Sequence, residues 1–185
     1  MVLGAGRGCP GRVTAVGACE VRKVRVAVFE RLAKDPRAVV LRSALQEVRR
    51  RGDRRIGTEH LFLGLLHDPK SVPVRALGVD LEAARAALDA LDRAALASVG
   101  IDVGGLRPSS LVPSRKRAPL TSAARSVLQR SLGEATSAKT RRRVTAEHML
   151  LALLACEQPD PAAELMAKLG VDRSAVRNRI GKSDT

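Results

Sequence analysis

The side chains in this sequence that could do chemistry together are two glutamate–histidine pairs, Glu59-His60 and Glu147-His148, set 88 positions apart. Each pair directly precedes a leucine-rich run. We therefore expect His60 and His148 to be structural, as buried and hydrogen-bonded rings that fix a loop-to-helix junction, with ligand binding as the alternative. Glu59 and Glu147 have two open interpretations. Each could stabilise a helix N-terminus by about 0.3 to 1 kcal/mol, or each could bind a ligand.

Metal binding and catalysis do not fit the pattern. His60 and His67 share a helical face at a spacing of seven, but a zinc site typically shows an i, i+4 pair or additional Cys or Asp ligands. Three cysteines without a Cys-x-x-Cys pair indicate free thiols in a reducing cytosol. Neither a Ser-His-Asp nor a Cys-His arrangement is visible. We expect no metal, no cofactor and no enzymatic activity.

Both pairs belong to an internal repeat, which is the most informative feature of the chain. Residues 56–66 return as residues 144–154 with five of eleven positions identical, and residues 77–80 return unchanged as residues 169–172. Upstream of each run, apolar residues recur at helical spacing. Since no stretch alternates with period two over the length of a strand, we predict an all-α fold built from two tandem four-helix repeats.

Helix start and stop signals divide each repeat in the same way. The first helix is expected over residues 36–50 in one repeat and 121–137 in the other. The second begins at an N-cap and continues through the leucine run, the short third has a first-turn proline and ends at a glycine, and the fourth begins at an aspartate N-cap. In chain order these residues are Gly57, Pro73, Gly78 and Asp80, then Thr145, Pro161, Gly170 and Asp172.

Glycine and proline mark the boundaries of the repeats. Residues 1–24 lack an apolar period and are predicted to be a disordered extension, with a mis-assigned start codon as the alternative. Residues 98–119 form the expected linker, which is rich in proline, glycine and serine and carries the basic triplet Arg115-Lys116-Arg117. Repeat 1 then occupies residues 25–97 and repeat 2 residues 120–185.

The composition combines an aliphatic core with a strongly basic surface. The 185 residues include 33 lysines and arginines against 19 acidic residues, which gives a net charge of +14. The excess is spread along the chain, as is typical of a solvated surface. Arginines nevertheless gather in equivalent loops before both Glu-His pairs, either as solvated charge or as an attraction for acidic partners or phosphate groups. They are Arg49, Arg50, Arg51, Arg54 and Arg55, then Arg141, Arg142 and Arg143.

The sequence favours a cytoplasmic protein without a membrane partner. No uncharged apolar run approaches the roughly 18 residues that span a bilayer. Glycines, arginines and a proline interrupt the N-terminus where a secretory signal needs an apolar region. A nucleic-acid-binding regulator that uses the basic loops is the alternative function, although the absence of Tyr and Trp removes the stacking platforms of single-strand binders.

The order of elements is itself distinctive. An amphipathic helix, a basic or polar loop, a motif such as Ile-Gly-Thr-Glu-His-Leu-Phe-Leu-Gly-Leu-Leu, a short helix, Leu-Gly-Val-Asp and a closing helix occur twice. This doubled pattern resembles the N-terminal repeat domain of Clp unfoldases of the ClpC, ClpA and ClpB type, over residues 33–97 and 118–182. The resemblance implies a pseudo-twofold pair of four-helix repeats that receives substrates or adaptors for AAA+ rings.

The chain contains no Gly-x-x-x-x-Gly-Lys-Ser/Thr motif, so we expect no ATP hydrolysis. In this respect it is similar to freestanding Clp N-domain proteins of actinobacteria. The resemblance implies a non-catalytic protein- or peptide-binding module of the Clp chaperone–protease system, acting as an adaptor, decoy or substrate receptor. The implied partners are a Clp unfoldase or its protein substrates. A remnant of an unfoldase gene that lost its rings is a further alternative.

The resemblance also implies a ligand. Members of the ClpC branch bind phosphorylated arginine on substrates through the glutamate of each Glu-His motif, and a carboxylate forms a strong bidentate pair with a guanidinium. Family members often open the first helix of each repeat with an aromatic residue and a threonine, where this chain has Ala33-Lys34 and Leu120-Thr121. The ligand-binding residues implied for peptides or phosphoarginine are Glu59, Glu147, Thr121, Thr58 and Thr145.

Overall fold

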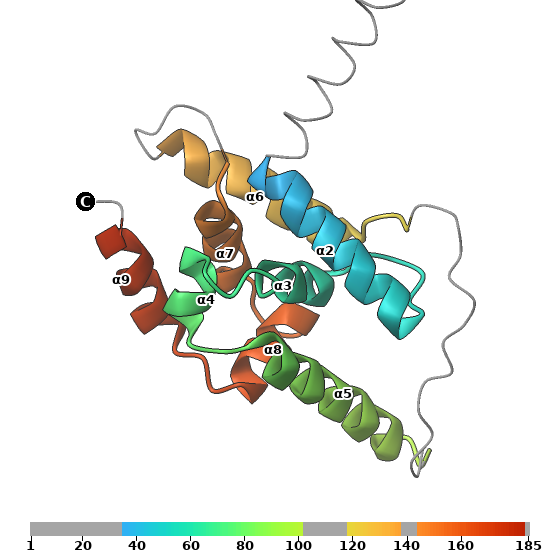
Figure 1. Cartoon of the computed structure of the whole chain (residues 1–185). Coiled ribbons are helices and arrows are strands. Elements are labelled where there is room, and N and C mark those ends of the chain that lie inside the picture. The colour runs from blue at the N-terminus through green and yellow to red at the C-terminus, as the bar shows by residue number, and fades with distance from the viewer. Residues whose placement is uncertain (1–34, 102–117, 138–143, 184–185) are drawn as a thin grey trace, which may run out of the picture. The chain divides into compact units, whose positions relative to one another are not determined.

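The computed structural model in Figure 1 describes residues 35–101, 118–137 and 144–183. The expected extension over residues 1–24, most of the linker 98–119, and the arginines at positions 115, 117 and 141–143 lie outside the described residues. Within them all regular secondary structure is helical, apart from one isolated parallel β-bridge between Ile56 and Leu120. The all-α expectation is confirmed.

Each repeat contains four helices. Repeat 1 is formed by α2 (Pro36–Arg51), α3 (Thr58–Leu65), α4 (Val72–Leu77) and α5 (Leu81–Ser98). Repeat 2 is formed by α6 (Ser122–Ser137), α7 (Ala146–Leu154), α8 (Pro161–Lys168) and α9 (Arg173–Ser183).

The boundaries follow the local signals that the sequence predicts. Gly57 and Thr145 are the N-caps of α3 and α7. The Asp80 carboxylate accepts a hydrogen bond from the Ala83 amide at the start of α5, and Asp172 accepts bonds from two backbone amides at the start of α9. Side-chain acceptors of this kind satisfy amides that have no partner within the helix.

The core is built around α3 and α7, which lie in the middle of the assembly of helices in Figure 1. Both helices are apolar on nearly all sides, so neither can leave a face in water and both must be covered all round. The largest fully buried side chains include Leu61, Phe62, Leu63, Met149, Leu150 and Leu153. One hydrophobic core therefore serves both repeats.

Contacts between helices show the pseudo-twofold relation of the repeats. The central helix α3 packs on α6 and α8 of repeat 2, and the central helix α7 packs in the equivalent way on α2 and α4 of repeat 1. The chain entering α6 also pairs with the loop of repeat 1: the Ile56 amide donates to the Pro119 carbonyl over 2.9 Å, and the Thr121 amide donates to the Ile56 carbonyl over 2.9 Å. Each repeat completes the covering of the other.

No helix among the described residues is both long enough and apolar enough to cross a bilayer. The expected cytoplasmic location stays a prediction.

The contact between α2 and α3 in repeat 1 depends on Gly64. A Cβ atom at this position would lie 2.7 Å from the Val40 carbonyl oxygen and 3.0 Å from the Ala44 amide nitrogen, both on α2. Backbone atoms cannot move aside as a flexible side chain can. The absence of a side chain at Gly64 therefore sets the separation of α2 and α3.

We expect Gly64→Ala to destabilise the protein by about 1 to 3 kcal/mol, because the added methyl group forces α2 and α3 apart. Gly133→Ala in α6 is the matched control, since a Cβ atom there meets nothing within 4 Å. It should stabilise the protein by about 0.5 to 1 kcal/mol through helix propensity. Urea denaturation of both variants provides the measurement. A Gly64→Ala variant as stable as Gly133→Ala would show that the α2–α3 approach is not limiting.

Candidate functional site

A pocket of about 420 Å³ opens where the loop between α2 and α3 meets the starts of α6 and α8. It brings together Glu59 of repeat 1 and Thr121 of repeat 2, which are 62 positions apart in the sequence. Most of its lining residues are polar or charged, and Leu88 and Pro161 are the apolar ones. The lining residues are Arg51, Asp53, Arg54, Arg55, Glu59, His60, Leu88, Asp92, Thr121 and Pro161.

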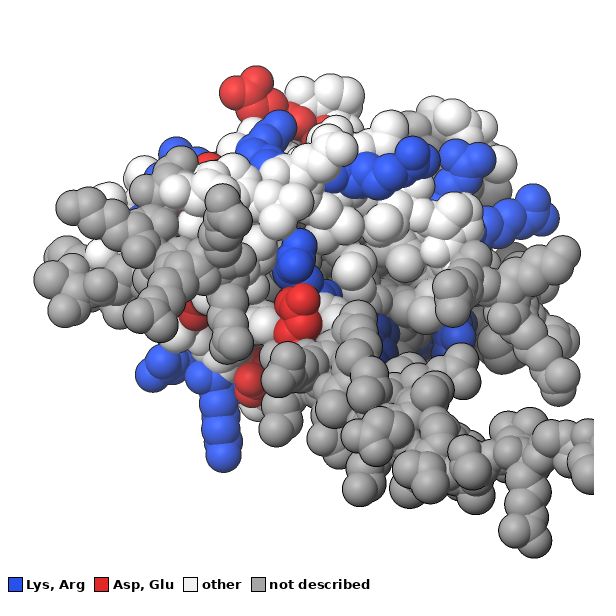
Figure 2. Space-filling model, turned by 90° about the horizontal axis from the view of Figure 1, so that it is seen from above, with Lys and Arg blue, Asp and Glu red and all other residues white. Residues whose placement is uncertain are grey.

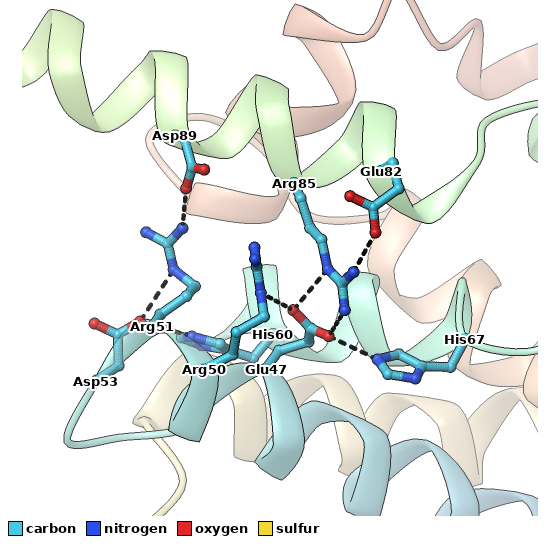
Figure 3. A network of polar contacts seen from close by, with 9 residues as sticks. All are labelled: Glu47, Arg50, Arg51, Asp53, His60, His67, Glu82, Arg85 and Asp89. Atoms are coloured by element: carbon cyan, nitrogen blue, oxygen red, sulfur yellow. Dashed lines mark hydrogen bonds and ion pairs between the residues drawn. The ribbon is translucent and has the colours of Figure 1, made fainter. Parts of the chain in front are cut away.

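His60 is the centre of the polar contacts in this pocket. Its ring is 2% exposed and its Nε2 lies 2.8 Å from Asp53 Oδ2, a contact drawn in Figure 3. Its Nδ1 has two neighbours, the Gly57 amide nitrogen at 3.1 Å and Glu59 Oε1 at 2.9 Å. These two contacts are alternatives, because a neutral Nδ1 accepts from the amide whereas a protonated Nδ1 donates to the carboxylate.

The two carboxylates favour the protonated ring. Burial alone would lower the pKa of His60, but the hydrogen bonds and charges of Asp53 and Glu59 outweigh burial and raise the pKa to about 9. The partners respond in the opposite direction. The hydrogen bond from His60 holds the pKa of Asp53 below its usual value. The pKa of Glu59 is also lowered, since the contact with His60 outweighs the effect of burial. At neutral pH the Glu59 carboxylate is therefore engaged within the protein.

The equivalent residues of repeat 2 are arranged differently. Here Thr145 replaces Gly57, and both its amide and its Oγ1 lie against His148 Nδ1, at 3.2 Å and 2.7 Å. His148 is buried, and Glu147 is half-buried at the start of α7. Among the described residues, the Glu147 carboxylate has no recorded hydrogen bond or ion pair.

A single glycine accounts for the difference between the two Glu-His pairs. A Cβ atom at Gly57 would lie 2.2 Å from Glu59 Oε1, so the carboxylate can fold back over His60 only where residue 57 has no side chain. Thr145 places a side chain at the equivalent position and fills the space beside the imidazole. Glu59 is thus paired with its neighbouring histidine, whereas Glu147 is left available.

The three threonines expected at the ligand sites also differ in their contacts. The Thr58 hydroxyl is 1% exposed and donates to Asp160 Oδ1 over 2.8 Å, which links α3 to the N-cap of α8. The Thr121 hydroxyl accepts from the Ala124 amide over 3.1 Å and lines the pocket. Thr145 contacts His148. Only Thr121 shares the pocket with a glutamate of the Glu-His motif.

The arginines of the repeat 1 loop have unequal roles. Arg51 donates to Asp53 over 3.2 Å, to Asp89 over 2.6 Å, and also to Asp92, so it holds the end of α2 against α5. Arg54 and Arg55 are exposed, line the pocket, and have no recorded hydrogen bond or ion pair with the described part of the chain.

A second polar network surrounds Glu47 of α2 and was not anticipated from the sequence. Glu47 is 1% exposed, and its carboxylate accepts from Arg85 of α5 and contacts His67 Nε2 at 2.8 Å (Figure 3). Burial alone would raise the pKa of Glu47, but the bonds from Arg85 and His67 hold the pKa below its usual value. The sequence contains a signal for this buried carboxylate, because Glu47 occupies a core position of α2 together with the buried Val40, Ala44 and Val48.

Among the described residues, no group of three or more His, Cys, Asp or Glu side chains could hold a metal ion. The arrangement around the pocket provides ion pairs and hydrogen-bond donors.

Comparisons with known proteins agree on one family. A model of the Clp repeat (R) N-terminal domain matches residues 35–154 and 119–183. A chloroplastic ClpA homolog of Brassica napus, described as an ATP-dependent Clp protease ATP-binding subunit, is 29% identical over 162 residues, which are 86% of this chain and 16% of the relative. The chloroplastic chaperone protein ClpC1 of Arabidopsis thaliana is 29% identical over 157 residues, 83% of this chain and 15% of the relative.

This chain therefore spans about a sixth of the length of these curated relatives. A solved structure shows the same fold: the N-terminal domain of the caseinolytic protease associated chaperone ClpD from Arabidopsis thaliana matches with a TM-score of 0.59 at 15% identity. The match covers 80% of this chain and 93% of that domain.

We expect Glu47→Gln to destabilise the protein by about 3 kcal/mol, because it removes the charge that compensates Arg85 within a buried network. Glu82→Gln is the matched control. Glu82 also contacts Arg85 but is 79% exposed, so its loss should cost less than about 0.5 kcal/mol. Chemical denaturation followed by circular dichroism gives both values. Equal effects of the two substitutions would contradict a structural role for the buried carboxylate.

The raised pKa of His60 predicts a pH-dependent stability. A folded pKa of about 9 lies above the unfolded value near 6.5, so the stabilisation is complete below about pH 6.5 and is lost as the pH rises through 9. Since one pKa unit corresponds to about 1.4 kcal/mol, the unfolding free energy should fall by at most about 3.5 kcal/mol over this range. His60→Gln should remove this pH dependence, whereas Glu82→Gln should retain it. An NMR titration that gives His60 a pKa near 6.5 would contradict the assignment.

Proposed function

This chain belongs to the Clp repeat N-terminal domain family, and on that premise we propose that it is a non-catalytic module that binds proteins or peptides in the Clp chaperone–protease system. It acts as a substrate receptor, adaptor or decoy, and its partners are a Clp unfoldase or the substrates of one. The family assignment, to which the doubled Glu-His motif led from the sequence, is confirmed by the family match over residues 35–154 and 119–183.

The observation that carries the proposal is the pocket shared by the two repeats. Glu59 and Thr121 both line it, although they come from different repeats. A binding site at the junction of two packed units, with a few polar groups converging on a hollow of about 420 Å³, is the usual arrangement for a small ligand or a peptide side chain.

Phosphoarginine is the ligand that we propose for the Glu-His motifs. A carboxylate binds a guanidinium through two parallel charge-assisted hydrogen bonds. Glu147 can form this pair without breaking an internal contact, since no partner of its carboxylate is recorded among the described residues. Glu59 must first leave His60. We therefore expect Glu147 to contribute more to guanidinium binding than Glu59.

Nucleic-acid binding has less support. On the face shown in Figure 2, Lys and Arg side chains lie at several places, with uncharged and some acidic residues between these places. Of the two phenylalanines, Phe62 is fully buried and Phe29 lies outside the described residues. The described surface thus offers no aromatic platform on which a base could stack.

Calorimetric titration of the whole chain with phosphoarginine tests the proposal, with arginine plus inorganic phosphate as the ligand control. We expect saturable binding that falls at least tenfold in the Glu59→Ala, Glu147→Ala double variant, because a tenfold loss corresponds to about 1.4 kcal/mol, the scale of one charge-assisted pair. Glu147→Ala alone should account for most of the loss. Far-UV circular dichroism should show an unchanged helix content.

The matched control is Glu82→Ala with Glu157→Ala, which removes two exposed carboxylates elsewhere and should leave binding unchanged. Unchanged binding in the Glu59, Glu147 double variant would exclude the Glu-His motifs as the binding sites.

A further inference from the structure

The carboxylates that line the pocket shared by the two repeats all contact cationic side chains of the protein. Asp53 contacts both Arg51 and His60, Asp92 contacts Arg51, and Glu59 contacts His60. An ion pair within the protein largely cancels the field of each partner at a distance. These three carboxylates therefore contribute little attraction for a cationic ligand.

The charges that remain unpaired in the pocket are positive. Arg54 and Arg55 are exposed and line the pocket, and among the described residues neither has a recorded hydrogen bond or ion pair. A guanidinium fork presents several donors in a plane that matches the oxygens of a phosphate or carboxylate. Two such forks on one rim form a natural receptor for an anionic oxygen group.

We propose that this pocket binds an anionic oxygen group, a phosphate or carboxylate carried on a peptide, through Arg54 and Arg55, and that Glu59 stays paired with His60 when the ligand carries no guanidinium. The proposal rests on the peptide-binding function proposed above and assigns a ligand class to one site. Thr121 supports it, because its Oγ1 already accepts from the Ala124 amide and its hydroxyl proton can be donated. Leu88 and Pro161 provide apolar wall for the chain that carries the anion.

The two repeats then differ in the charge that they recognise. Gly57 lets Glu59 fold back onto His60, whereas Thr145 occupies the equivalent space and leaves Glu147 available. One residue thus determines whether the glutamate faces a ligand or a histidine. The pocket that Arg54 and Arg55 line takes the anion, and Glu147 of repeat 2 takes the cation.

The test uses three dye-labelled peptides of sequence Gly-Gly-X-Gly-Gly, with serine, glutamate or phosphoserine at X, and measures anisotropy with the full chain. None of them contains a guanidinium, so Glu147 does not determine the result. We expect the phosphoserine peptide to bind at least tenfold more tightly than the serine peptide, and inorganic phosphate to compete with it. The glutamate peptide distinguishes the two sources, since binding equal to that of phosphoserine indicates an acidic side chain as the natural ligand.

Substitution of the two arginines locates the site. Arg54→Gln with Arg55→Gln should weaken phosphoserine-peptide binding at least tenfold. Arg42→Gln with Arg49→Gln removes the same charge from exposed positions of α2 outside the pocket, and should have less than a twofold effect. Equal losses of affinity in the two double variants would show that binding depends only on the net charge of the protein, and would overturn the proposal.

Gly57→Thr provides a variant that adds no charge. Residue 57 has φ −96°, which any residue adopts, and the added side chain displaces only the flexible end of Glu59. The released carboxylate faces the pocket, so phosphoserine-peptide affinity should fall several-fold and the pKa of His60 measured by NMR should decrease. Unchanged affinity together with an unchanged His60 titration would contradict the proposed role of Glu59.

The outcomes for this site and for the proposed function are separable. No preference for phosphoserine over serine overturns the anion site, and phosphoarginine binding that still depends on Glu147 would leave the proposed function standing. Anion binding that requires Arg54 and Arg55, together with phosphoarginine binding that is unchanged in the Glu59, Glu147 double variant, would support the pocket and refute the assignment of phosphoarginine to the Glu-His motifs.

Discussion

The burial of α3 and α7 is the constraint on which the rest of the structure depends. These two short helices are apolar on nearly all sides, and neither repeat has enough covering elements to shield its own central helix. Helices of the opposite repeat therefore complete the covering, α6 and α8 over α3, and α2 and α4 over α7. Because the Glu-His motif begins each central helix, its polar residues lie where the buried interior of one repeat meets the chain of the other. The pocket that joins Glu59 to Thr121 is a consequence of this arrangement.

Among the described residues, the ion-pair networks are concentrated on repeat 1. Glu47 sits at a core position of α2 and requires Arg85 and His67 for compensation. In repeat 2 the residue aligned with His67 is Ala155, and no ion pair is recorded there among the described residues. Two structurally similar repeats thus stabilise their outer helices by different means. Such divergence is possible because the aliphatic core provides most of the driving force for folding, which leaves the polar contacts free to vary.

Much of the fold could be predicted from the sequence because its signals are local. An aspartate N-cap such as Asp80 acts on amides within three residues of it, so spacing alone reveals it. The internal repeat added the two tandem four-helix units, and the resemblance to the Clp N-terminal domain added their pseudo-twofold pairing. The candidate site could be predicted only in part. His60 and Glu59 were identified from the motif, but the contact of Arg51 with Asp89 joins residues 38 positions apart, and the approach of Thr121 to Glu59 depends on how the repeats pack. No local spacing encodes such contacts.

The arginine-rich loop shows why composition is a poor guide to what a surface binds. In the sequence its arginines are indistinguishable, and the net charge of +14 suggests a uniformly basic protein. In the structure Arg51 forms ion pairs with three aspartates, two of which lie on α5 and so hold the end of α2 against that helix. Arg54 and Arg55 form no such pair among the described residues, so their charge is available in the pocket. Glu59 is likewise neutralised by His60, although the same residue type in repeat 2 is not. The charge that a ligand meets is the charge left after internal pairing. In this chain that remainder is set by tertiary contacts and by the single difference between Gly57 and Thr145.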